Sequence, residues 1–175
     1  MKYKIIIVIF VILLGNQKSF SQNSSIRGKC IDDNSSVRIE WASVHFITDS
    51  GKQFSTSADT GGNFEFKIGD EAGDIMVIYP NCYTIKILNI PVGFKQIDLG
   101  EIKMVDSFYK HLFRMDGSLT YMDKETIDEH NSLRKEVLEN YRIRLLNKEL
   151  KPRFSGDNLI FDFNNGTCLK ANEFK

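Results

Sequence analysis

Hydrophobic and polar residues alternate along the first two thirds of the chain, in short runs separated by turn-forming residues. A period of two is typical of a strand with one buried face. The runs are rich in β-branched and aromatic residues, which favour strands. They predict seven strands, at residues 25–31, 42–48, 52–57, 63–68, 74–79, 83–89 and 96–103. Seven short strands at this spacing predict a β-sandwich.

Two segments between these strands have the composition of tight turns. Residues 49–52, DSGK, predict a hairpin between the second and third strands. Residues 58–66, ADTGGNFEF, place two glycines after Asp59 and before a strand. A phosphate-binding loop instead precedes a helix, and an EF-hand loop carries more acidic residues. We therefore expect a turn in which glycine supplies a positive φ and Asp59 accepts hydrogen bonds from the local backbone.

In the last predicted strand, the apolar residues change from odd-numbered to even-numbered positions. Ile97 and Leu99 point to one face, whereas Ile102 lies on the opposite face of a regular strand. One extra residue at Gly100 would return all three side chains to the core. The sequence therefore predicts a β-bulge with Gly100 at positive φ.

The pattern becomes helical from about residue 123 to residue 149. Thr120 and Asp123 fit a capping box, and Asp123 alone also fits an N-cap. Pro152 is expected to stop the helix. The predicted apolar stripe consists of Ile127, Leu133, Val137, Leu138, Tyr141 and Leu145.

The residues that follow the predicted helix suggest its C-terminal charge partners and one further hairpin. Lys148, Lys151 and Arg153 are expected to interact favourably with the negative end of the helix dipole. Residues 159–163 and 167–169 flank an Asn-Asn-Gly segment, which predicts a terminal hairpin.

The N-terminus resembles a secretory signal peptide. Lys2 and Lys4 precede an apolar run at residues 5–14, and small residues at Ser19 and Ser21 suit cleavage before Gln22. An uncleaved anchor is the alternative, but a membrane span needs about 20 apolar residues. We expect an exported protein that is periplasmic, cell-surface or secreted and has no membrane span after removal of the signal.

The predicted organisation has three parts. They are a signal peptide at residues 1–21, a β-sandwich at 22–104 and a helical extension with a terminal hairpin at 105–175. Seven strands are enough to bury two inner faces, so residues 22–104 are expected to have their own core. A lone helix is marginal in water, so the extension is expected to dock on the sandwich or on a partner.

Charge and cysteine content narrow the interpretation. The chain has 23 basic and 23 acidic residues, and removal of Lys2, Lys4 and Lys18 with the signal leaves a net charge of −3. Such a charge gives no general attraction for nucleic acid. Of the three cysteines, Cys30 and Cys82 lie in the predicted sandwich and Cys168 lies in the tail. We therefore predict a Cys30–Cys82 disulfide, which export permits.

Several short motifs occur in the order found in a known family. They are Ile26-Arg27-Gly28-Lys29, Trp41-Ala42-Ser43-Val44, the segment from Asp59 to Phe64, Cys82-Tyr83, and Asp98-Leu99-Gly100-Glu101-Ile102. Residues 25–104 thereby resemble the carboxypeptidase regulatory-like domain, a transthyretin-like seven-stranded sandwich. Such domains are attached to metallocarboxypeptidases and to the periplasmic ends of outer-membrane receptors and are not catalytic there. The resemblance implies an accessory or binding role.

Motifs for catalysis or for bound cofactors are not found in the sequence. It contains no Gly-x-Ser-x-Gly elbow, no His-Glu-x-x-His and no phosphate loop. His45, His111 and His130 are not at zinc-binding spacing, so no metal and no cofactor is predicted. Aromatic residues offer a candidate ligand surface, although packing is their commoner role. The candidates are Trp41, Tyr79, Tyr83 and Tyr121.

Two functional hypotheses follow. The first is an exported, non-enzymatic accessory or binding module of the bacterial cell envelope, whose partner is an envelope protein, a peptide or a glycan. The alternative is a small exported hydrolase with His111, Asp116 and Glu125 at the junction of sandwich and helix. That alternative requires the three side chains to converge within hydrogen-bonding reach. Neither hypothesis fixes the ligand or the oligomeric state.

Overall fold

The computed structural model describes residues 24–107 and 124–170, and it is mainly β with one helix. The seven predicted strands are all present, each within one residue of its expected bounds. They are β1 (Ser24–Asp32), β2 (Ser43–Thr48), β3 (Gln53–Ser57), β4 (Asn63–Ile68), β5 (Gly73–Ile78), β6 (Thr84–Ile90) and β7 (Gln96–Met104).

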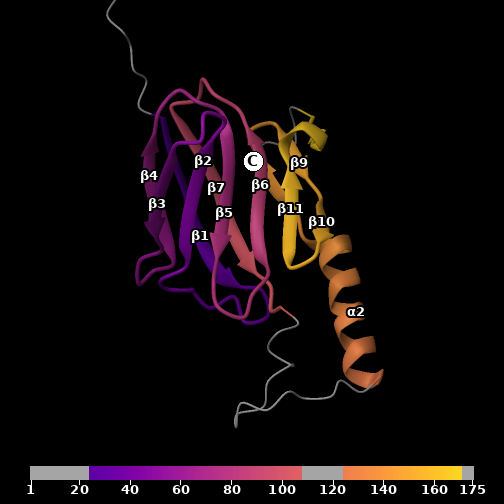
Figure 1. Cartoon of the computed structure of the whole chain (residues 1–175). Coiled ribbons are helices and arrows are strands. Elements are labelled where there is room, and N and C mark those ends of the chain that lie inside the picture. Colours follow the sequence, from indigo (N-terminus) through magenta and orange to yellow (C-terminus); the bar gives the residue numbers. More distant parts are fainter. Residues whose placement is uncertain (1–23, 108–123, 171–175) are drawn as a thin grey trace, which may run out of the picture.

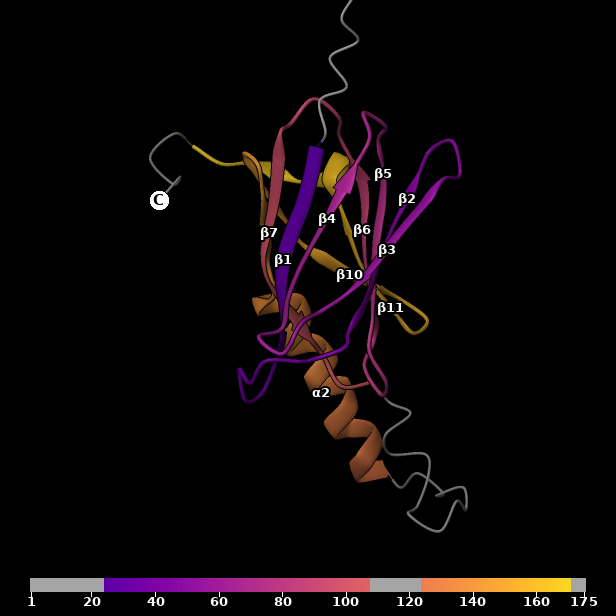
Figure 2. The same ribbon diagram turned by 90° about the vertical axis from the view of Figure 1, so that its left-hand side faces the viewer.

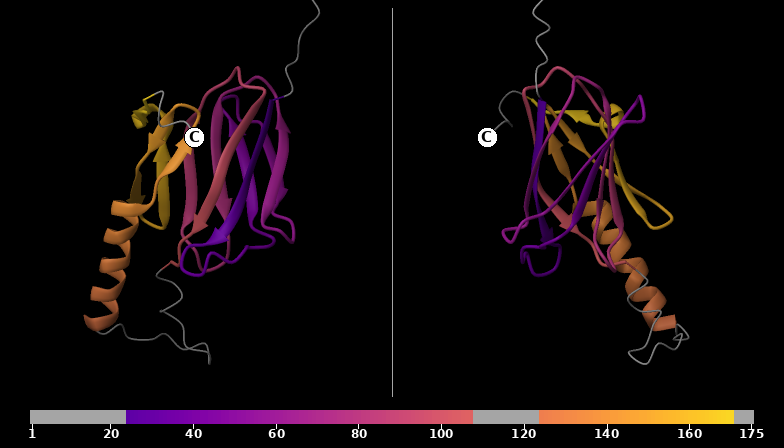
Figure 3. Two further views of the ribbon diagram at one scale, coloured as in Figure 1. Left: turned by 180° about the vertical axis from the view of Figure 1, so that it is seen from behind. Right: turned by 60° about the vertical axis from the view of Figure 1, so that its left-hand side comes forward.

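These seven strands belong to two facing sheets. One sheet has the order β4-β1-β7, in which β1 is antiparallel to β4 and parallel to β7. The other has the order β10-β11-β6-β5-β2-β3 and lies in front in Figure 1. Its strands β10 (Pro152–Ser155) and β11 (Asn158–Asp162) come from the last third of the chain. In the left-hand view of Figure 3, which looks at the molecule from behind, β1 and β7 lie in front. The predicted β-sandwich is therefore confirmed.

Apolar side chains from both sheets fill the space between them. Phe46 of β2 and Phe66 of β4 come from opposite sheets, and their ring centroids lie 6.4 Å apart. The strands alternate between buried and exposed side chains, as β4 does with Phe64, Phe66 and Ile68 inside. The alternation of apolar and polar residues in the sequence therefore identifies the residues that form the core.

Both turn predictions and the bulge are confirmed. Gly51 at φ 86° lies in the β2–β3 turn, and Gly62 at φ 76° lies in the turn between β3 and β4. The carboxylate of Asp59 accepts hydrogen bonds from the backbone N–H groups of Gly61 at 2.7 Å and Asn63 at 2.8 Å. In β7 the register with β1 shifts near Gly100, which has φ 64°.

The helix is shorter than predicted. α2 (Lys124–Asn140) ends before residue 149, and two short strands follow, β8 (Ile143–Leu145) and β9 (Lys148–Leu150). Ile143 and Leu145 are buried on either side of exposed Arg144, so this stretch has the period of a strand. The guanidinium of Arg142 donates to the carbonyls of Leu138, Glu139 and Tyr141 and so satisfies the end of the helix. The helix-terminal role predicted for Lys148, Lys151 and Arg153 is therefore wrong.

The prediction of a terminal hairpin is also wrong, because its two expected strands pair with other strands and not with each other. Pro152 begins β10 (Pro152–Ser155), which pairs antiparallel with β11 (Asn158–Asp162) through a turn containing Gly156 at φ 57°. β11 also pairs in parallel with β6. After the short helix η2 (Phe163–Asn165), β12 (Thr167–Cys168) pairs with β9. Leu159 and Phe161 of β11 thereby enter the core of the sandwich.

A single hydrophobic cluster extends across the predicted boundary at residue 104. Its members from the last third are Val137, Tyr141, Ile143, Leu145, Leu150, Leu159 and Phe161. The hydroxyl of Tyr141, which is 5% exposed, accepts a hydrogen bond from the Lys103 backbone N–H at 2.8 Å. The last third therefore adds strands and core residues to the sandwich.

The helix contacts the sandwich through one face, from His130 to Val137. Val137 is buried, whereas Ile127 and Leu138 are 39% and 40% exposed. In Figures 1 and 2, α2 extends beyond the end of the sheets. No helix within residues 24–107 and 124–170 is long and apolar enough to cross a membrane.

Candidate binding surface

The outer face of the three-stranded sheet has a hollow of about 520 Å³. It spreads over β1 and its two neighbours, β4 and β7, and reaches the turn that precedes β4. Its lining residues are Arg27, Gly28, Lys29, Asp59, Asn63, Phe64, Glu65, Asp98, Gly100 and Glu101. Most of these residues are polar or charged.

The charged side chains form two rows across the three strands. In the first row, Arg27 of β1 is in register with Glu65 of β4 and Asp98 of β7. The Nε and Nη2 atoms of Arg27 both donate to Asp98 Oδ2, at 2.8 Å and 2.6 Å. Acidic and basic groups thus alternate across the sheet.

The second row lies one strand repeat further along. Lys29 is in register with Asn63 on one side and Glu101 on the other. Lys29 Nζ lies 3.4 Å from Glu101 Oε1. Strands are about 4.8 Å apart and same-face residues are about 6.8 Å apart, so the two rows form a regular grid of donors and acceptors.

The β-bulge is what aligns these rows. Arg27 and Lys29 are two residues apart, whereas their partners Asp98 and Glu101 are three apart. In a regular strand, Asp98 and Glu101 would point to opposite faces. The extra residue at Gly100 turns both acids outward and also buries Ile102 in the core.

Hydrogen bonds favour the ionised form of two acids of the hollow, Asp98 and Asp59. Partial burial raises the pKa of Asp98, but the Gly100 N–H and the Arg27 guanidinium outweigh it and lower that pKa below its ordinary value. The pKa of Asp59 is also lowered, chiefly by the hydrogen bond from the Asn63 N–H. The side chains of Arg27 and Asp98 are 49% and 50% exposed, so a ligand can reach them.

Glycine determines the packing beneath the hollow. A Cβ atom on Gly28 would lie 2.7 Å from Cζ of Phe64, closer than side chains approach each other. Phe64 is in register with Gly28 and is buried. The lack of a side chain at residue 28 therefore allows Phe64 to pack across β1.

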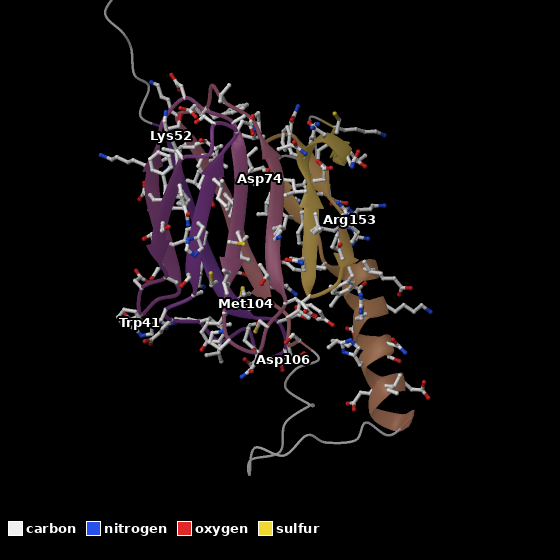
Figure 4. All side chains as sticks on the ribbon, in the orientation of Figure 1. Trp41, Lys52, Asp74, Met104, Asp106 and Arg153 are labelled. Carbon is white, nitrogen blue, oxygen red and sulfur yellow. The ribbon has the colours of Figure 1, made fainter. Side chains whose placement is uncertain are left out.

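The predicted aromatic surface does not form as a set. Trp41 is 71% exposed at the end of the sandwich that Figure 4 shows at lower left, and Tyr79 is half-buried near the same end of the neighbouring strand. Tyr83 is only 1% exposed and belongs to the core, so it cannot line an open surface. Tyr121 lies outside the described residues.

Tyr83 instead attaches the helix to the sandwich. Its hydroxyl lies 2.9 Å from Nε2 of His130, and its ring packs edge-on against Phe154 with centroids 4.9 Å apart. The guanidinium of Arg134 lies 4.3 Å from the centre of the Phe154 ring. Burial raises the pKa of Tyr83. These contacts account for the tyrosine without a ligand.

The structure does not contain the predicted Cys30–Cys82 disulfide. Cys30 is a buried thiol on β1, and burial raises its pKa to about 12. Cys82 lies just before β6 of the other sheet and forms an isolated β-bridge with Asp106. Facing sheets pack about 10 Å apart, beyond the roughly 7 Å Cα separation that a disulfide spans. Membership of one sandwich was therefore not enough to predict the bond.

The residues of the hydrolase alternative fall where the structure gives no side-chain positions. His111 and Asp116 lie outside the described residues, as does the side chain of Glu125. His45 Nδ1 lies 2.9 Å from Ser55 Oγ and 3.0 Å from Gln53 Nε2. Among the described residues, no group of three or more His, Cys, Asp or Glu side chains could hold a metal ion.

The sequence contained a signal for the charged rows that the search for motifs missed. Alternation in the predicted strands already placed Arg27 and Lys29 on one outer face. The predicted bulge placed Asp98 and Glu101 on the outer face of the last strand. The missing information was that β1 lies between β4 and β7, a non-consecutive arrangement.

The similarity of this chain to known proteins is distant. No model of a known family matches it, and no curated protein matches it. Among solved structures it is similar to a 9R-lipoxygenase from Cyanothece PCC8801, at 11% identity and a TM-score of 0.39, covering 59% of this chain and 19% of that chain. It is also similar to the C-terminal fragment of the pilus adhesin SpaC from Lactobacillus rhamnosus GG, at 12% identity and a TM-score of 0.32, covering 80% of this chain and 43% of that chain. The chain thus spans less than half the length of either structure.

Proposed function

We propose that this protein is an exported, non-enzymatic binding module of the bacterial cell envelope and that it binds its ligand on the outer face of β4-β1-β7. The observation that carries the proposal is the alignment of Arg27 and Lys29 with Asp98 and Glu101 by the bulge at Gly100. Bulges commonly occur next to functional sites, where they re-aim side chains. Here the bulge places four charged groups on one accessible, rigid face.

The chemistry of the face favours a polar ligand. The two rows offer cationic donors flanked by carboxylate or amide groups, so both donors and acceptors on a ligand can be matched. Nearly balanced charge favours hydrogen-bonding recognition over attraction to a polyanion. A peptide or glycan of the envelope has this mixture of groups. The ion pairs are half-exposed and each contributes little to folding, so exchanging them for ligand contacts costs little stability.

Export is supported by the N-terminal sequence. Positive residues, an apolar run and small residues before Gln22 are the features that direct secretion and cleavage. The resemblance of residues 25–104 to carboxypeptidase regulatory-like domains also favours an accessory role outside the cytoplasm. Fractionation of cells and N-terminal sequencing of the exported protein test this part, with Gln22 expected as the first residue.

Ligand binding is tested with the full exported chain against a panel of envelope peptides and glycans by calorimetry. A double variant, Arg27→Ala with Lys29→Ala, removes the central cations of both rows. The matched control is Arg153→Ala, an exposed arginine on β10 of the other sheet (Figure 4). We expect the double variant to lose binding and the control to keep it. The proposal would be contradicted if the native chain bound no member of the panel or if the double variant bound as tightly as the native chain.

A further inference from the structure

Strand β3 ends the six-stranded sheet, and no described strand pairs with its outer side. It lies along the rim of the sandwich that faces the viewer in Figure 2. Edge strands present rows of backbone N–H and C=O groups that can pair with another chain. Natural edges are commonly protected by lysine, proline or a bulge within the strand. β3 has the sequence Gln-Phe-Ser-Thr-Ser and contains neither residue, and its pairing with β2 is regular.

The register with β2 shows which groups of β3 point outward. The Thr48 N–H donates to the Lys52 carbonyl at 2.9 Å, and the Ala58 N–H donates to the Ala42 carbonyl at 2.9 Å. Hydrogen-bonded pairs alternate along an antiparallel ladder, so Phe54 and Thr56 bond to β2. The backbone groups of Gln53, Ser55 and Ser57 therefore point away from the sheet.

We propose that this edge pairs with the same edge of a second copy of the chain, antiparallel about a two-fold axis at Ser55. In this register the three outward residues meet outward residues of the second copy. Ser55 faces Ser55, and Gln53 faces Ser57 in both directions. Each such pair exchanges two hydrogen bonds. The parity required for hydrogen bonding is thus met at every position of the strand.

The side chains of β3 are self-complementary in the same register. Phe54, half-buried at the rim, comes beside Thr56 of the second copy, so an aromatic ring meets a methyl group at each of the two symmetric positions. The strand has no charged residue, so no like charges meet within it. A two-fold arrangement closes with two chains, because both copies use the same edge.

The native exported chain tests this inference by sedimentation, and we expect twice the chain mass at high concentration. Ser55→Pro removes the outward N–H at the two-fold axis, and an edge strand tolerates proline at such a position. Ser55→Ala removes the same hydroxyl, including its contact with His45, but keeps the N–H. We expect Ser55→Pro to raise the dimer dissociation constant at least about tenfold and Ser55→Ala to leave it nearly unchanged. A monomeric native chain at about 1 mM, or equal effects of the two variants, would overturn the proposal.

A second measurement fixes the register and does not depend on the proline variant. Facing residues in a hydrogen-bonded pair have Cα atoms about 5.5 Å apart, within disulfide range. Ser55→Cys should therefore give a crosslinked dimer under mild oxidation, with a 55–55 peptide in the mapped digest. Ser57→Cys is the control on the same edge, because its two copies would lie about 13 Å apart. A 57–57 peptide as abundant as the 55–55 peptide would overturn the proposed register.

Discussion

Replacement of Gly100 by valine is the mutation that tests the bulge most directly. Gly100 has φ 64°, and a Cβ atom placed there would meet nothing within 4 Å. The cost of a side chain is therefore a backbone cost and not a steric clash with neighbours. A non-glycine residue in the left-handed region costs about 1–2 kcal/mol, and a β-branched residue lies at the upper end. The reduced entropy of the unfolded chain offsets about 0.4–1 kcal/mol.

We therefore expect Gly100→Val to destabilise the protein by more than about 1 kcal/mol, measured as a lower free energy of unfolding in urea. Gly100→Asn is the matched control, because asparagine tolerates positive φ, and it should cost clearly less. The open space around the position makes this order informative. A neutral valine variant, or an asparagine variant as unstable as the valine variant, would refute the backbone argument.

Three further predictions concern the core, the surface and the boundary at residue 104. Tyr141→Phe should lower the free energy of unfolding in urea by about 1–3 kcal/mol, because the Lys103 N–H loses its buried acceptor; an unchanged melt would count against the contact. The ammonium of Lys52, followed by the Ser50 hydroxyl, lowers the pKa of Glu71 to about 2. The contribution of Glu71 to folding stability is therefore present above its unfolded pKa and is lost as the pH falls towards 2. Glu71→Gln should therefore be less stable than the native chain at pH 7 in thermal melts, and the difference should shrink as the pH falls from about 4.5 towards 2. A difference that stays constant over this range would contradict the assigned pKa. A chain of residues 22–104 should remain β-rich by circular dichroism but melt lower and self-associate, because it lacks β11 beside β6; an unfolded fragment would show that the last third is needed for folding.

The sequence predicted the local structure of the first two thirds because that structure repeats with a period of two. Ile97, Leu99 and Ile102 even revealed the bulge, since burial of all three requires one extra residue. The helix end was less predictable. Tyr141 and Leu145 fit a helix, whereas Ile143 and Leu145 fit a strand, and the strand pattern prevails because both residues are buried in the core.

Local sequence patterns could not predict which strands pair when the strands are far apart in the sequence. The parallel pairing of β11 with β6 joins segments more than sixty residues apart, so no turn signal identifies it. For the same reason, Leu159 and Phe161 suggested a local hairpin and not a strand of the main sheet. The charged rows illustrate the same limit, because Arg27 and Asp98 become neighbours only when β1 pairs with β7.

The central claim is that the face of β4-β1-β7 binds an envelope ligand, and amide chemical-shift mapping tests it most directly. The labelled exported chain is titrated with each peptide and glycan of the envelope panel while backbone resonances are followed. The account predicts saturable shifts concentrated at residues 27–29, 63–65 and 98–101, which line the hollow. Shifts concentrated on the opposite sheet, or none with any member of the panel, would contradict it.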